Sequence, residues 1–136
     1  MAMFTHLLLA IAALLAPTAS QPPNSYAEGQ VWEYRNRPQD NGSLLKIQRI
    51  EAKDGSPIYH ISLKGVRIGG RLNEIQHLPV SDQTLNDSVT RKATDPGDFP
   101  SADEGIAQWR KARGGIFTIP LNQVADVVDQ TIPAQH

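Results

Sequence analysis

The fold is decided by residues 43–68, which read SLLKIQRIEAKDGSPIYHISLKGVRI. Apolar and polar residues alternate on both sides of Asp54-Gly55, and this period of two is typical of β-strands. Asp-Gly between two such runs is a strong signal for a hairpin turn, so the segment predicts two antiparallel strands. We expect Ser56-Pro57 to lengthen the loop before a strand over Ile58–Leu63. The alternation changes phase at Ile50, which predicts either a β-bulge or burial on both faces near the end of the first strand.

Further strand and helix patterns flank this hairpin. Segments that predict additional strands are Gln30–Arg35, Val66–Ile68 and Ile116–Ile119, and Asn73–Val80 is either a fourth strand or an extended lead-in. Pro79 confines its strand to an edge or an end of the sheet. Apolar residues at helical spacing follow Ser81, Ser101 and Pro120, and a capping-box pattern begins at Ser101. Because strands precede helices, we predict an α+β fold, with an antiparallel sheet of three to five strands and two or three helices packed on one face. Trp109 is expected in the core.

The first twenty residues have the composition of an export signal. Residues 1–20 contain no Asp, Glu, Lys or Arg, and 15 of them are apolar. The apolar run Leu7–Ala16 is shorter than the ~20 residues that a membrane-spanning helix needs. We therefore predict a signal peptide over residues 1–20, an extended leader over residues 21–29 and a single α+β domain over residues 30–136, with no membrane span after signal removal. The predicted location is periplasmic or secreted; the alternatives are a buried N-terminal helix or a retained anchor.

Composition excludes several classes of protein. The 136 residues include no cysteine, so disulfide scaffolds, thiol catalysis and Cys-ligated metal centres are excluded. The net charge of −1 disfavours a strongly basic nucleic-acid binder. The charge is unevenly distributed, because residues 21–71 carry eight Lys or Arg against five Asp or Glu, and residues 72–136 carry five against nine. A basic, strand-rich half is thus joined to an acidic, helix-rich half.

Residue types that support catalysis are present but form no recognisable motif. The sequence has no Gly-x-Ser-x-Gly, and side chains two apart on a strand, such as His60 and Ser62, lie ~7 Å apart, too far for direct proton transfer. We expect His60 to face solvent. A metal-assisted hydrolytic site could form from His60, His77 and Glu74 only if the fold brought them together. No pair is distinguished among the available carboxylates, which are Glu28, Glu33, Glu51, Asp98, Asp103 and Glu104. We therefore predict no catalytic residue, no metal ligand and no cofactor.

A binding surface is the favoured interpretation. If the strand phases are right, the sheet face away from the core carries Arg35, Lys46, His60 and Lys64. Such a face could attract an acidic protein partner, whereas it lacks the interleaved aromatic residues typical of nucleic-acid binding. The alternative is a solvated face that protects the strands from aggregation. The leading hypothesis is a non-catalytic periplasmic protein-binding module, inhibitor-like or immunity-like. The alternatives are a small hydrolase or metal-assisted enzyme that uses His60 or His77 with Glu74, and an envelope structural protein.

Four segments resemble a group of small exported bacterial proteins that have no assigned activity. They are Glu28–Tyr34, His77–Ser81, Glu104–Arg110 and Gly115–Pro120. The resemblance spans most of the chain after residue 20 and implies a bacterial, hence periplasmic, protein. It implies no functional residue.

Overall fold

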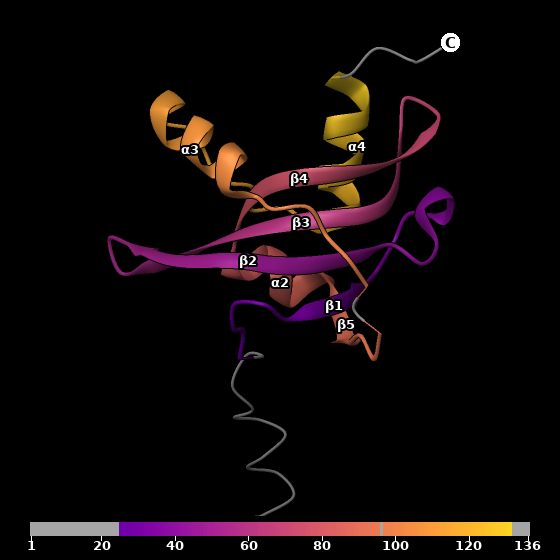
Figure 1. Ribbon diagram of the computed structural model, residues 1–136, viewed down its shortest axis with the longest axis horizontal. Helices are drawn as coiled ribbons and strands as arrows, with labels where there is room; N and C mark the ends of the chain where they lie inside the picture. The colour runs from indigo at the N-terminus through magenta and orange to yellow at the C-terminus, as the bar shows by residue number, and fades with distance from the viewer. Residues whose placement is uncertain (1–24, 96, 132–136) are drawn as a thin grey trace, which may run out of the picture.

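One antiparallel β-sheet organises the chain. The computed structural model describes residues 25–95 and 97–131, in which five strands pair in the order β4-β3-β2-β1-β5 and three α-helices accompany them (Figure 1). In chain order the elements are β1 (Val31–Tyr34), the 3-10 helix η1 (Pro38–Asp40), β2 (Leu44–Lys53), β3 (Ser56–Ile68), β4 (Arg71–Ser81), α2 (Asp82–Ser88), β5 (Val89–Lys92), α3 (Asp103–Ala112) and α4 (Leu121–Thr131). The predicted α+β class with an antiparallel sheet is confirmed. The predicted signal segment, residues 1–20, lies outside the described residues.

The central hairpin joins β2 to β3 through a tight turn. Asp54 and Gly55 have φ angles of 53° and 81°, the left-handed backbone that two-residue hairpin turns require. Lys53 pairs directly with Ser56, so the prediction that Ser56-Pro57 lengthens the loop is wrong. The reason is geometric. Two residues with positive φ reverse the chain direction in a way that matches the right-handed twist of the flanking strands, so the hairpin does not need a loop of more than two residues.

The pairing register shifts at four places in the described sheet, and the β-bulges in β2 and β4 are two of them. The phase change predicted at Ile50 is confirmed as a bulge in β2, where Gln48 is the extra residue. In β4, Gln76 and His77 together lie opposite Ser62 of β3. The second bulge keeps the apolar residues on both sides of it in the core, and it turns His77 to the opposite face of the sheet.

The main core covers one face of the sheet. Its buried side chains come from every strand and from α2 and α4, and they are Trp32, Tyr34, Leu45, Ile47, Tyr59, Ile61, Leu63, Val66, Ile68, Leu78, Val80, Leu85, Val89, Leu121, Val124 and Ala125. Tyr26 adds its ring edge-on to Trp32 and Tyr59, at centroid distances of 5.7 and 5.3 Å. The late strand predicted over residues 116–119 contributes only one parallel bridge, between Phe117 and Val80.

Helix α3 and the segment before it lie against the other face. Residues 97–102 cross in front of β2 and β3 in the view of Figure 1. Ala102 and Ile106 are each 1% exposed and bury one side of α3. Trp109 is half-buried beside His60 and His77 and does not join the main core. The prediction that places Trp109 in that core is wrong because α3 packs on the opposite face.

Of the two helix caps predicted from the sequence, at Ser81 and at Ser101, only the one at Ser81 forms as expected. Ser81 Oγ accepts a hydrogen bond from the Thr84 amide and caps α2 as expected. Helix α3 begins at Asp103, so Glu104 sits too early to form a capping box with Ser101, whose Oγ accepts from the Asp103 amide instead. None of the helices in the described part of the chain is both long and apolar enough to span a bilayer.

Candidate functional site

The structure brings together only part of the predicted basic face. Arg35 leaves it, because its guanidinium donates to the Asp87 carbonyl at the end of α2, on the core side of the sheet. The prediction that His60 faces solvent is wrong, because α3 covers its side chain, which is 0% exposed. Lys46 and Lys64 are half-buried and share this side of the sheet.

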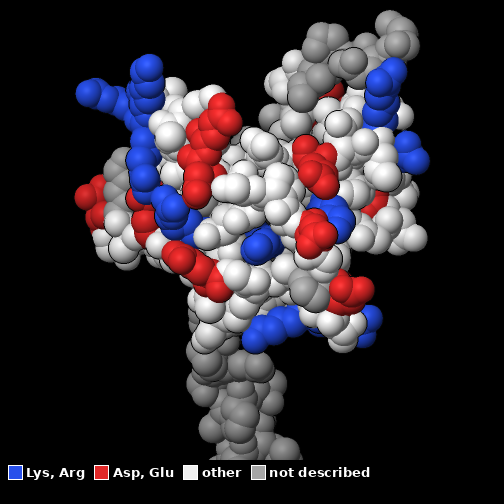
Figure 2. Space-filling view, viewed as in Figure 1, with Lys and Arg blue, Asp and Glu red and all other residues white. Residues whose placement is uncertain are grey.

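Lys64 is held by the segment that crosses the sheet. Its Nζ donates to the Asp98 carbonyl over 3.1 Å and lies 5.4 Å from the centroid of the Phe99 ring. Figure 2 shows this side of the molecule, and acidic side chains are interspersed there among the basic ones. The face is therefore neither open nor uniformly basic, and a binding role for its four predicted residues stays a prediction.

A chain of hydrogen bonds links the two histidines to a carboxylate. Nε2 of His60 is hydrogen-bonded to Glu51 Oε1, and Nδ1 of His60 lies 2.8 Å from Nε2 of His77. The two imidazole rings stack with centroids 5.0 Å apart, and the Trp109 ring meets His60 edge-on at 4.9 Å. Arg110 donates to the second oxygen of Glu51 over 3.1 Å. We call these five residues, from β2, β3, β4 and α3, the histidine cluster.

Local features of the strands position this cluster. The two-residue turn places Glu51 opposite Ile58, which makes Glu51 and His60 diagonal neighbours on one face. The bulge in β4 turns His77 toward the same face. Gly105 lets α3 approach closely, because a Cβ added there would lie only 2.5 Å from Cβ of His77.

One arrangement of protons satisfies the histidine cluster. Ionised Glu51 accepts from Nε2–H of His60, whose Nδ1 then accepts from Nε2–H of His77. The hydrogen bond from His60 lowers the pKa of Glu51. Burial lowers the pKa of His60, and burial together with the neighbouring His60 lowers the pKa of His77 to about 4. Both imidazoles are therefore neutral at pH 7, and within the described residues Nδ1 of His77 has no hydrogen-bond partner.

The cluster differs from the predicted hydrolytic or metal site. His60 and His77 are adjacent, as that alternative requires, but Glu51 takes the place of Glu74, which is exposed on β4. Across the described residues, no group of three or more His, Asp or Glu is arranged to hold a metal ion. The Ser62 hydroxyl donates to a β4 carbonyl over 2.6 Å and so does not contact His60 as a nucleophile would.

Replacing Gly105 with Ala is expected to lower the free energy of unfolding by about 1–3 kcal/mol. In most helix interiors the same change stabilises a protein by about 1 kcal/mol, so a reversed sign is diagnostic of the contact with His77. Urea denaturation measures the effect. The control is Ala107→Ser, at an exposed position of the same helix, which is expected to change stability by less than about 0.5 kcal/mol. A stabilised Gly105→Ala variant would contradict the close packing.

The second candidate site is the outer edge of β4. This strand ends the sheet on one side, as Pro79 predicts, and Val80 pairs beyond it with Phe117. Phe117 N donates to Pro79 O, and Ser81 N donates to Phe117 O, so main-chain pairing already occupies this end. Residues 71–77 have no strand beyond them among the described residues, and most are exposed. We call residues 71–77 the β4 edge.

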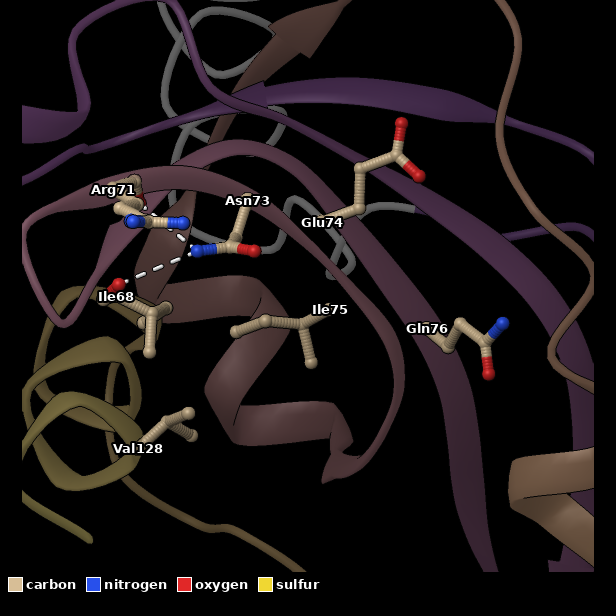
Figure 3. A pocket seen from close by; sticks show the side chains of 7 residues that line it. All are labelled: Ile68, Arg71, Asn73, Glu74, Ile75, Gln76 and Val128. Atoms are coloured by element: carbon tan, nitrogen blue, oxygen red, sulfur yellow. Dashed lines mark hydrogen bonds between the residues drawn. The ribbon is translucent and has the colours of Figure 1, made fainter. Parts of the chain in front are cut away.

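Cavities flank the β4 edge on both faces of the sheet. The Val128 cavity, of about 490 Å³, is lined by Ile68, Arg71, Asn73, Glu74, Ile75, Gln76 and Val128. The Pro100 cavity, of about 720 Å³, is lined by Lys64, Gly65, Leu72, Asn73, Glu74, Gln76 and Pro100. Arg71 and Ile75 line only the first cavity and Leu72 only the second, as the alternation of a strand requires. In Figure 3, Glu74 and Gln76 extend away from Val128, whereas Ile75 extends toward it.

No protein-family model, no curated protein and no solved structure matches this chain. The β4 edge and the histidine cluster are therefore the features of the described chain that point to a function. Sequence reasoning missed Glu51 as the partner of His60, although the two-residue hairpin turn carries that information.

Proposed function

We propose that the protein is a non-catalytic, exported protein-binding module that takes up an extended segment of its partner as an additional strand on the β4 edge. The observation that carries this proposal is an unpaired strand edge, among the described residues, with a cavity on each face of the sheet. In strand addition, main-chain hydrogen bonds supply affinity and pockets for alternate side chains supply specificity. The β4 edge offers both.

The length and exposure of the β4 edge support this mode of binding. Seven residues at the rise of a β-strand extend over roughly 23 Å, enough for a short partner strand. Leu72, at 65% exposed, is the most exposed large apolar side chain among the described residues, and a partner strand would cover it. The pairing of Phe117 with β4 marks where the free edge ends.

A hydrolase built on the histidine cluster is the less favoured function. Among the described residues, Nδ1 of His77 is the one ring nitrogen of the cluster without a hydrogen-bond partner, and a pKa of about 4 makes His77 a weak base at neutral pH. One cavity beside the cluster is lined by Glu51, Trp109, Arg110, Arg113 and Gly114, and neither histidine lines it. Binding at the β4 edge needs no such chemistry.

Lysines placed on the β4 edge are expected to reduce partner capture by about tenfold or more, because lysine on an edge strand is a natural device against strand addition. The double variant Leu72→Lys/Asn73→Lys changes exposed positions on this edge. Capture of proteins from a periplasmic extract by the immobilised variant and wild type, quantified by mass spectrometry, measures the effect. Thr90→Lys, on the opposite edge strand β5, is the control and should capture as wild type does. Equal capture by all three proteins would refute the proposal.

A further inference from the structure

We infer that the segment bound at the β4 edge alternates apolar and basic residues, with its apolar side chains in the Val128 cavity and a Lys or Arg opposite Glu74. This inference rests on the proposed function, because it specifies the ligand of the same edge. It follows from the different chemistry of the two faces that an added strand would meet.

The Val128 cavity favours apolar side chains. Its wall next to α4 consists of Ile68, Ile75 and Val128. Ile68 is buried in the main core, and Ile75 and Val128 are half-buried and pack against that core. Asn73, which also lines this cavity, turns its amide back on its own hairpin and donates to the carbonyls of Ile68 and Arg71, at 3.3 and 3.0 Å (Figure 3). The amide donors are thus already used, and the α4 side of the cavity presents hydrocarbon.

On the opposite face, across from Lys64, β4 carries the carboxylate of Glu74, which lines both cavities. Glu74 is exposed and forms no ion pair within the described part of the chain. Its cross-strand neighbour Lys64 does not neutralise it, because Nζ of Lys64 donates to the Asp98 carbonyl and lies over the Phe99 ring. A strand added beyond β4 would place one of its side chains beside Glu74, and opposite charges across strands stabilise pairing while like charges oppose it.

A second copy of this chain does not fit these requirements. Antiparallel pairing of two identical edges places side chains of the same face opposite one another. A second β4 edge would offer Arg71, Asn73 and Ile75 to the Val128 cavity, and of these three only Ile75 suits its apolar α4 side. It would offer Leu72, Glu74 and Gln76 to the other face, of which none is basic. A different protein segment is therefore the better occupant.

Synthetic peptides test this inference with the full purified protein. The peptide Val-Lys-Val-Lys-Val-Lys-Val, with blocked ends, is expected to bind at least about tenfold more tightly than the same peptide with Glu in place of Lys. A Ser-Lys alternating peptide, and a Val-Lys peptide with N-methylated amides, should bind weakly, because one lacks apolar side chains and the other lacks main-chain donors. Fluorescence anisotropy measures affinity, and amide hydrogen exchange locates binding at residues 71–77.

Variants of the protein separate the charge effect from strand addition itself. Glu74→Gln is expected to reduce the ratio of the affinities for the Lys and Glu peptides to about threefold or less. Glu104→Gln, at an exposed carboxylate on α3, should leave this ratio unchanged. Equal affinities for the Lys and Glu peptides, or a preference that Glu74→Gln leaves intact, would overturn the inference but not the proposed function. A self-association that protects residues 71–77 would replace the inferred partner with a second copy. Absence of exchange protection at residues 71–77 with every peptide would overturn both.

Discussion

Replacing Asp40 with Ala is expected to lower the free energy of unfolding by about 3–5 kcal/mol, because the change breaks a buried ion pair from one side. Asp40 is 1% exposed and Arg37 is 6% exposed. The Asp40 carboxylate accepts from Nε of Arg37 at 2.6 Å, from a terminal nitrogen of Arg37 at 3.1 Å and from the Arg67 amide at 2.8 Å. Truncation would leave Nε of the buried Arg37 guanidinium and the Arg67 amide without their acceptor.

The same network holds α4 beside the hairpin that forms the β4 edge. Arg37 also donates to Asp126 and Asp129 of α4, at 3.0 and 3.2 Å, and to the Arg67 carbonyl of β3 at 2.7 Å. Asp129 in turn accepts from the Gly69 amide at the hairpin turn, at 2.7 Å. Since α4 supplies one wall of the Val128 cavity, loss of this network should also loosen the proposed binding site.

An exposed ion pair provides the matched control for Asp40→Ala. Glu33 and Arg91 pair at 3.0 Å, but their side chains are 37% and 77% exposed. Glu33→Ala should therefore cost less than about 1 kcal/mol. Urea denaturation, followed by intrinsic tryptophan fluorescence, measures both variants. A loss for Asp40→Ala no greater than that for Glu33→Ala would show that the Arg37 network contributes little to stability.

Much of the sheet can be predicted from local sequence alone. The central hairpin and α4 are predictable because alternation and helical spacing extend over enough residues to be decisive. Strand β5 escapes prediction, because it contains only four residues, Val-Thr-Arg-Lys, of which only Val89 is buried. Its conformation depends on pairing with β1, and the paired residues Glu33 and Arg91 are 58 positions apart in the sequence. A local sequence pattern cannot predict pairing over such a separation.

The histidine cluster can be predicted only in part. A two-residue turn at Asp54-Gly55 places Glu51 beside His60. The Ser56-Pro57 pattern favours a longer loop, and a longer loop would give a different pairing register. His77 joins the cluster through a bulge, and Trp109 through packing of a helix from the far end of the chain. Both are tertiary effects, which explains why the local pattern around His60 is that of a solvent-facing strand residue.

Lowering the pH from 7.5 to 4.5 is expected to reduce the free energy of unfolding by about 2–3 kcal/mol through the histidine cluster. The pKa of His77 is about 4 in the folded protein and that of His60 is also lowered, whereas an unfolded histidine has a pKa of 6.5. The unfolded chain therefore binds more protons below pH 6.5, so stability is complete above that pH and is lost as the pH falls toward 4. The lowered pKa of Glu51 acts in the same direction at still lower pH.

The main physical cause is burial of the two imidazoles, and for His77 the neighbouring His60 lowers the pKa further. His60 Nδ1 accepts from His77 in the neutral pair, and a proton on that nitrogen would place two donors 2.8 Å apart in a buried space. His77→Gln keeps a hydrogen-bond donor for His60 but cannot titrate. The variant should therefore remove about half or more of the loss in free energy of unfolding between pH 7.5 and pH 4.5. Glu74→Gln, a change on the same strand outside the cluster, should leave that loss unchanged. Urea titrations at both pH values measure the difference, and an undiminished pH dependence in His77→Gln would assign the acid sensitivity to groups outside the cluster.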